Sequence, residues 1–257
     1  SSIRADLDAL FGTSLQSSGS PSSADKNILI GIVTTSGYIK SSFETALALA
    51  GDLLRALQAD STFRANFNQI YSLTVPAQGV PSSSNVAGLF SIVSSAGYDL
   101  TALQASVGSL SALVSAFQSD ATLRLSIDLL FGTSLPASGN PSSADTATLN
   151  GIIQAQGYDL DTFKVAVVAA ASLYSDAQSS TQLRTDLNKI ENLSLAATGA
   201  PSSSDRGALF AIVGTVSYSK SAYEALITAV ASLYADAQSS SSVASFRGRR
   251  LNAGAAG

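Results

Sequence analysis

The sequence predicts an all-α protein built from four tandem repeats of 60 residues, each made of three helices. Two observations lead to this prediction. The segments that begin at Ser1, Ser61, Ala121 and Thr181 align without gaps at a constant period, and apolar residues recur in each segment at helical spacing between loops with Gly and Pro. A unit of this size is marginal alone, so neighbouring repeats should share one core, as a helical array or a closed bundle.

Several residue types return at the same place in every repeat. Regular columns are Gly19, Gly79, Gly139 and Gly199; Pro21, Pro81, Pro141 and Pro201; and Gln58, Gln118, Gln178 and Gln238. Repeats one and three share the string LFGTSL, and they carry Asp8 and Asp128 where repeats two and four carry Asn68 and Asn188. The chain should therefore form two pseudo-symmetric halves, residues 1–120 and 121–240, followed by a flexible basic tail at 241–257.

The first helix of each repeat is short. In the second repeat it covers about 62–72, where three apolar side chains share one face. The apolar positions are Phe63, Phe67 and Ile70, with Ile3, Leu7 and Leu10 or Leu123, Ile127 and Leu130 as equivalents. Asp60, Asp120 and Ser180 stand just before these helices, where a polar side chain can accept hydrogen bonds from the free amides.

The second helix follows the Gly-Pro loop. It begins with a capping-box pattern in three repeats, formed by Ser22 with Asp25, Ser142 with Asp145, and Ser202 with Asp205. Its expected buried face in the first repeat is Leu29, Ile32 and Val33. Gly37, Gly97 and Gly157 stand where a left-handed residue ends a helix, and Ser217 replaces this glycine in repeat four.

The third helix is the longest. In the first repeat its apolar positions alternate by four and three residues, which is the spacing of one helix face. These positions are Phe43, Leu47, Ala50, Leu54 and Leu57, and the third repeat continues the pattern with Phe163, Val167, Ala170 and Tyr174.

The composition excludes several classes of chemistry. The chain has no Cys, Met, Trp or His, which removes cysteine nucleophiles, histidine triads, disulfides and thiolate or imidazole metal sites. Its net charge of −4 does not favour nucleic acid as a partner. No run of 18 apolar residues occurs, so no transmembrane segment is expected. Because even residue 1 is not Met, Ser1 is interpreted as the end of a processed, secreted chain.

Two columns are candidate interaction sites. Arg4, Arg64, Arg124 and Arg184 lie in the first turn of a helix, where a cation is unfavourable and needs a partner. That partner is either a carboxylate or a loop carbonyl, or else an anion or other ligand bound by every repeat. Tyr38, Tyr98, Tyr158 and Tyr218 precede the third helices. They are either packed rings with a hydroxyl bonded to backbone or aromatic contacts for a ligand such as a pigment.

The tail differs from the body in charge. Residues 241–257 contain Arg247, Arg249 and Arg250 and no acid, so the tail carries +3, while 11 basic and 18 acidic residues give the body −7. A basic arm on an acidic body could bind a neighbouring copy and produce a homo-oligomer.

Two resemblances to known proteins add to this interpretation of the sequence. The pattern F-x-x-D-x-x-L-R, L-x-x-I-x-x-x-G-Y-D and a following apolar helix start resembles the small helical Nif11-type domain over about two thirds of each repeat. The residues that carry this resemblance are Phe117, Asp120, Leu123, Arg124, Leu149, Ile152, Gly157, Tyr158, Asp159 and Phe163. The family is associated with leader segments read by peptide-modifying enzymes, a role that a tandem array without a peptide core does not fit. The Ser-rich and Ala-rich composition is similar to that of helical repeats in secreted silk and glue proteins.

These observations favour a non-enzymatic, secreted structural or assembly protein that associates with itself and needs no cofactor. The alternative is a carrier that encloses a lipid or a pigment such as a carotenoid in an apolar cavity between helices. An enzyme ranks third, because it would need a polar cleft with strongly perturbed carboxylates.

Overall fold

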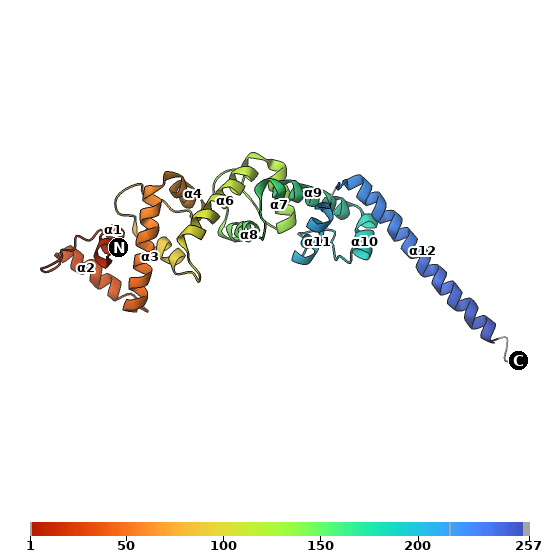
Figure 1. Ribbon diagram of the computed structural model, residues 1–257, viewed down its shortest axis with the longest axis horizontal. Helices are drawn as coiled ribbons and strands as arrows, with labels where there is room; N and C mark the ends of the chain where they lie inside the picture. The colour runs from red at the N-terminus through yellow and green to blue at the C-terminus, as the bar shows by residue number, and fades with distance from the viewer. Residues whose placement is uncertain (1, 216, 254–257) are drawn as a thin grey trace. The chain divides into compact units, whose positions relative to one another are not determined.

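The computed structural model describes residues 2–215 and 217–253, with side chains up to residue 239 (Figure 1). These residues form twelve α-helices and no strand. The structure therefore confirms the all-α prediction.

The helices fall into three groups by their place in the sequence repeat. The first helices are α1 (Ile3–Phe11), α4 (Ser61–Tyr71), α7 (Ala121–Phe131) and α10 (Thr181–Ile190). The second helices are α2 (Ser23–Val33), α5 (Ser83–Val93), α8 (Ser143–Ile153) and α11 (Ser203–Val213). The third helices are α3 (Lys40–Ala59), α6 (Leu100–Ser119), α9 (Leu160–Ser179) and α12 (Lys220–Ala253).

The chain divides into two compact units, which are described separately. Unit 1 comprises Ser1–Ser119 and Pro136–Tyr158, and unit 2 comprises Asp120–Leu135 and Asp159–Gly257. The boundaries differ from the expected halves because a second helix packs on the third helix that precedes it in the sequence. Helix α8 accordingly packs against α6 in unit 1, while α7 packs against α9 in unit 2.

Three kinds of helix pairing recur inside the units, one of which packs a first helix on the preceding third helix, as in α4 on α3 and α10 on α9. Each first helix packs against the third helix of its own repeat, as in α1 with α3, α4 with α6, α7 with α9 and α10 with α12. Each of the three later second helices packs against the preceding third helix, as in α5 with α3, α8 with α6 and α11 with α9.

The caps of the first helices are as predicted. Asp60 Oδ1 accepts hydrogen bonds from the amides of Thr62 and Phe63 at 2.8 and 3.0 Å. Asp120 caps α7 in the same way, and the Ser180 hydroxyl caps α10 by accepting from the amide of Leu183 at 3.2 Å. The expected apolar faces are buried except at Ile3, which is exposed at the start of α1.

The second helix of the first repeat begins with the predicted capping interactions. Asp25 N donates to Ser22 Oγ at 3.1 Å, and the backbone amide of Ser22 interacts with the Asp25 carboxylate. The same carboxylate accepts from the Ser22 hydroxyl at 2.6 Å and from the amide of Ser14 at 3.0 Å. The hydroxyl hydrogen bond lowers the pKa of Asp25.

The predicted buried face of α2 is wrong. Leu29 and Ile32 are half-buried and Val33 is exposed, although the equivalents of Leu29 in the other second helices are fully buried. Among the described residues, α5, α8 and α11 each pack on the third helix that precedes them, whereas no such helix contacts α2.

The left-handed glycines are present but are not the helix caps. Gly37, Gly97 and Gly157 have φ of 79°, 76° and 75°, and Ser217 has φ of 65°. Helix α2 ends earlier, with Thr34 as its C-cap in the right-handed region. The glycine lies in a following turn that the amide of Tyr38 closes by donating to the Thr35 carbonyl at 3.1 Å.

The third helices form the core. The apolar positions predicted for α3 and α9 are fully buried, apart from the half-buried Phe43 and Phe163. Helix α12 continues to Ala253, into the range expected to be a tail. The side chains of Arg247, Arg249 and Arg250 lie outside the described residues.

Candidate functional site

Two arginines of the repeat column hold the end of the preceding third helix. Arg64 Nη1 donates to the carbonyl of Leu57 at 2.9 Å, and Arg184 Nη1 donates to the carbonyls of Ala177 and Gln178 at 2.9 and 3.0 Å. A cation is favourable there because the carboxyl end of a helix carries partial negative charge. The partner is thus the carboxyl end of a helix, and neither a carboxylate nor the Gly-Pro loop.

The other two arginines are placed at the corresponding turns. Arg124 is half-buried near the start of α7, and Arg4 is exposed near the start of α1. Within the described residues, Arg4 is not beside the carboxyl end of a third helix.

The glutamine column attaches three of the four Gly-Pro loops to the preceding third helix. Gln58, Gln118 and Gln178 donate from Nε2 to the carbonyls of Gly79, Gly139 and Gly199, at 2.9, 2.6 and 2.9 Å. In unit 2 the hydroxyl of Tyr174 donates to the same Gly199 carbonyl at 2.9 Å. One polar contact thus accompanies each packing of a second helix on a third.

A second contact recurs at the same junctions, between the C-cap of a first helix and the residue after the loop glycine. Asn140 Nδ2 donates to Ser72 Oγ at 3.2 Å. A Cβ built on Gly132 would lie 3.5 Å from the Cβ of Ala200, and one built on Gly12 would lie 4.0 Å from the Cβ of Val80. Three junctions therefore bring together the same pair of positions.

Aromatic side chains cluster at two of these junctions. In unit 1 the rings of Phe43 and Phe90 stack with centroids 5.8 Å apart, and Phe11 lies 6.5 and 6.1 Å from them. In unit 2 the corresponding cluster is Phe131, Phe163 and Phe210, with centroid separations of 6.3 to 6.4 Å.

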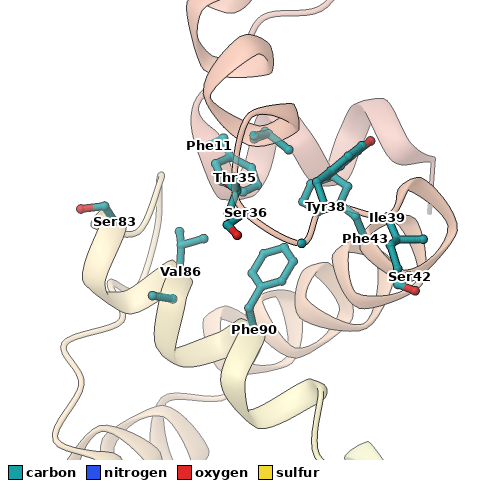
Figure 2. Close-up of a pocket in the computed structure, with 13 residues that line it drawn as sticks. Phe11, Thr35, Ser36, Tyr38, Ile39, Ser42, Phe43, Ser83, Val86 and Phe90 are labelled. Carbon is teal, nitrogen blue, oxygen red and sulfur yellow. The ribbon is translucent and has the colours of Figure 1, made fainter.

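The cluster in unit 1 lines an apolar cavity of about 460 Å³. Figure 2 shows Phe90 and Val86 projecting from α5 toward Phe11 and Tyr38. Tyr38 is thus the one candidate tyrosine that lines this cavity, and its ring lies 5.6 Å from that of Phe43. The size and lining are those of a site for an apolar small molecule.

The other tyrosines of the column are placed differently. The hydroxyls of Tyr98 and Tyr218 are buried without a hydrogen-bond partner among the described residues, so the expected bond to backbone is not made there. Burial, followed by the nearby carboxylates of Asp52 and Asp99, raises the pKa of Tyr98 to about 12. Tyr158 occupies the equivalent position before α9.

Acidic residues gather between α9, α10 and α12 in unit 2. Asp176 forms an ion pair with Lys220, and Glu191 Oε1 accepts a hydrogen bond from the hydroxyl of Tyr223 at 2.7 Å. Burial, and then the neighbouring Asp176, raise the pKa of Glu224. No group of three or more metal-ligating side chains occurs within residues 2–215 and 217–239.

One of the described helices is long and apolar enough to cross a bilayer. Helix α6 has a mean hydropathy of 1.4 over 18 residues, and 33% of that window is buried. Core helices meet the same criterion, and α6 packs against α4 and α8. The absence of a transmembrane segment stays a prediction.

Sequence reasoning missed the role of the Asp8 and Asn68 column, whose alternation was visible. Asp8 Oδ1 accepts from the Thr13 hydroxyl at 2.5 Å and from the Leu15 amide at 3.1 Å. Asn68 bonds both backbone groups of Val75. These side chains hold the loop after each first helix, so the column is structural.

Comparison with known proteins leaves the site to be interpreted from its geometry, because no family model, curated protein or solved structure matches the chain.

Proposed function

We propose that this chain is a non-enzymatic, secreted structural protein that assembles with further copies of itself. Its four sequence repeats act as three-helix units that add to one another through one recurring contact, the packing of a second helix on the preceding third helix. The observation that carries the proposal is the exposure of large apolar side chains on α2 and α12, at positions whose equivalents in the other repeats are buried or half-buried.

The contrast on α12 is the strongest. Leu233 is 70% exposed, whereas its equivalents Leu53, Leu113 and Leu173 are fully buried. On α2, Val33 is 51% exposed, whereas its equivalent Val93 is 4% exposed and the other two equivalents, Ile153 and Val213, are half-buried. Exposed apolar surface at positions otherwise used for packing is typical of an association site.

The experiment is sedimentation velocity on the complete chain over a wide range of concentration. Self-association predicts that the average mass rises with concentration. A strict monomer throughout the range would overturn the proposal.

The cavity in unit 1 favours a second candidate function, the carriage of an apolar lipid or pigment. A carrier should keep its ligand through native purification, so an absorbance spectrum and an organic extract of the same sample test this function. A monomeric protein with a pigment or lipid in stoichiometric amount would place the carrier first.

A further inference from the structure

The packing of a second helix on the preceding third helix is repeated three times in the chain. It unites α5 with α3, α8 with α6 and α11 with α9. Each case brings the loop glycine carbonyl to a glutamine of the third helix, and the residue after that glycine to the C-cap of the preceding first helix. This contact is therefore a defined way of adding one repeat to another.

Helix α2 carries the surface for this contact, and in the described part of the chain no third helix packs against this surface in the manner of α3 on α5. Pro21, before α2, is exposed, whereas Pro81, Pro141 and Pro201 are buried. Leu29 is half-buried and Ile30 is 47% exposed. The side of α2 that bears Pro21, Leu29, Ile30 and Val33 is called the α2 face below.

Helix α12 carries the opposite surface, on which none of the second helices among residues 2–215 and 217–253 packs. Tyr234 is 47% exposed, whereas its equivalents Leu54, Val114 and Tyr174 are buried. Ala237 is exposed, although Leu57, Phe117 and Ala177 at the same position are fully buried. Leu233, Tyr234 and Ala237 are called the α12 face below.

The residues around the two faces are also complementary. The pairing of Ser72 with Asn140 would, two junctions later, place Asn192 of one copy beside Ser20 of the next, and both are exposed polar residues. The pairing of Phe131 with Arg206, whose Cζ lies 4.4 Å from the ring centroid, would place Glu191 beside Lys26. Opposite charges would then meet at the position where the junction of α11 with α9 has a cation on a ring.

We propose that a second copy of this chain binds with its α2 face to the α12 face of the first, in the manner of α5 on α3. The proposal rests on the proposed function and specifies its interface. The contact uses two different surfaces, so each added copy leaves one α2 face and one α12 face free. Assembly therefore proceeds either to a closed ring or to an open chain of copies.

Two single substitutions test this arrangement. Val33→Glu places a charge on the α2 face, and Leu233→Glu places one on the α12 face; both sites are exposed in the free chain, so folding should persist. Each variant alone should associate at least ~10-fold more weakly than the unaltered chain, because an unpaired charge would be buried. Leu125→Glu and Val165→Glu are matched controls, since these apolar residues are 63% and 74% exposed on α7 and α9.

Mixing the two variants gives the decisive result. The mixture retains one intact α2 face and one intact α12 face, so sedimentation should show a 1:1 dimer and nothing larger. Dimers formed by either variant alone, or unchanged association in both, would overturn this interface while leaving self-association in place. A monomeric unaltered chain would overturn the interface and the proposed function together.

Disulfide cross-linking tests which residues of the two copies lie opposite each other, that is, the register of the interface. The chain has no cysteine, and the internal Cβ separations of 3.5 and 4.0 Å suit a disulfide. A chain with Ser20→Cys mixed with a chain with Asn192→Cys should form a cross-linked dimer on mild oxidation. In the control, the chain with Asn192→Cys is mixed with a chain that carries Ala65→Cys, at an exposed site of α4, in place of Ser20→Cys. Equal yields from the two mixtures would contradict the register.

Discussion

The guanidinium of Arg206 lies over the ring of Phe131, with Cζ 4.4 Å from the ring centroid, and its Nη1 donates to the carbonyl of Leu130 at 3.2 Å. The equivalent residue beside Phe11 in unit 1 is Val86, which lines the apolar cavity. Valine has no group that could lie over a ring in this way. The difference at one position therefore distinguishes the two aromatic clusters.

Val86→Arg should close the cavity in unit 1. The new guanidinium can lie over Phe11 and donate to the Leu10 carbonyl, as Arg206 does at Phe131, so the variant should fold with little loss of stability. An apolar fluorescent dye that binds the unaltered chain should bind this variant with an affinity at least ~10-fold lower, because the cavity loses apolar volume. Fluorescence titration measures the change, and Arg206→Val should produce a new dye site in unit 2. Equal affinity of the unaltered chain and Val86→Arg would show that the dye binds elsewhere.

Gly51→Ala should destabilise the protein although alanine is the better helix former. A Cβ at Gly51 would lie less than 3 Å from the buried Asp6 carboxylate, which Arg55 holds by an ion pair at 2.8 Å. Overpacking of this kind costs ~1–3 kcal/mol, which exceeds the gain of about 1 kcal/mol in helix propensity. Urea unfolding followed by circular dichroism gives the change in free energy.

The third repeat provides the control for Gly51→Ala, because it has Ser126 and Ala171 at these two positions. In an Asp6→Ser background the added methyl group has room, so the cost of Gly51→Ala should vanish or change sign. The same cost in both backgrounds would contradict the proposed clash.

The sequence predicts the helices well because their signals are local. Asp60 and Ser22 cap helices by hydrogen bonds to amides three or fewer residues away. The helical spacing of Leu47 and the other apolar residues of the third helix indicates which face of that helix is buried. The exposure of Val33 was not predictable in this way, since it depends on which helix packs against α2. The cavity at Tyr38 also requires tertiary packing, because its lining comes from four separated segments.

Asp128 and Thr133 should be energetically coupled. Asp128 Oδ1 accepts from the Thr133 hydroxyl at 2.7 Å and from the Leu135 amide at 2.9 Å. Asp128→Asn replaces a carboxylate acceptor by an amide and weakens a buried hydrogen bond, which costs ~1–3 kcal/mol. The double variant Asp128→Asn with Thr133→Leu has the residues of repeats two and four at both positions. Its loss in free energy of unfolding should be smaller than the sum of the losses in the two single variants.

A double-mutant cycle in urea measures the coupling of Asp128 and Thr133, with ~0.5–3 kcal/mol expected for residues in direct contact. The opposite substitution in repeat four, Asn188→Asp, should destabilise the protein. Asn188 Nδ2 donates to the Leu195 carbonyl at 3.2 Å, and an ionised carboxylate has no proton to donate. Additive effects at Asp128 and Thr133 would contradict this account of the alternating column.

Ser217→Gly should stabilise the protein. Ser217 has φ of 65° in the position where the other three repeats have glycine with φ between 75° and 79°. A left-handed conformation costs an L-residue ~1–2 kcal/mol, and the greater freedom of glycine in the unfolded chain offsets about half of this gain. A net increase of ~0.5–1 kcal/mol in the free energy of unfolding is therefore expected from urea titration. The opposite substitution, Gly157→Ser, is the matched control and should lower stability by a similar amount; a loss of stability in both variants would mean that the Ser217 side chain makes a contact worth more than its backbone strain.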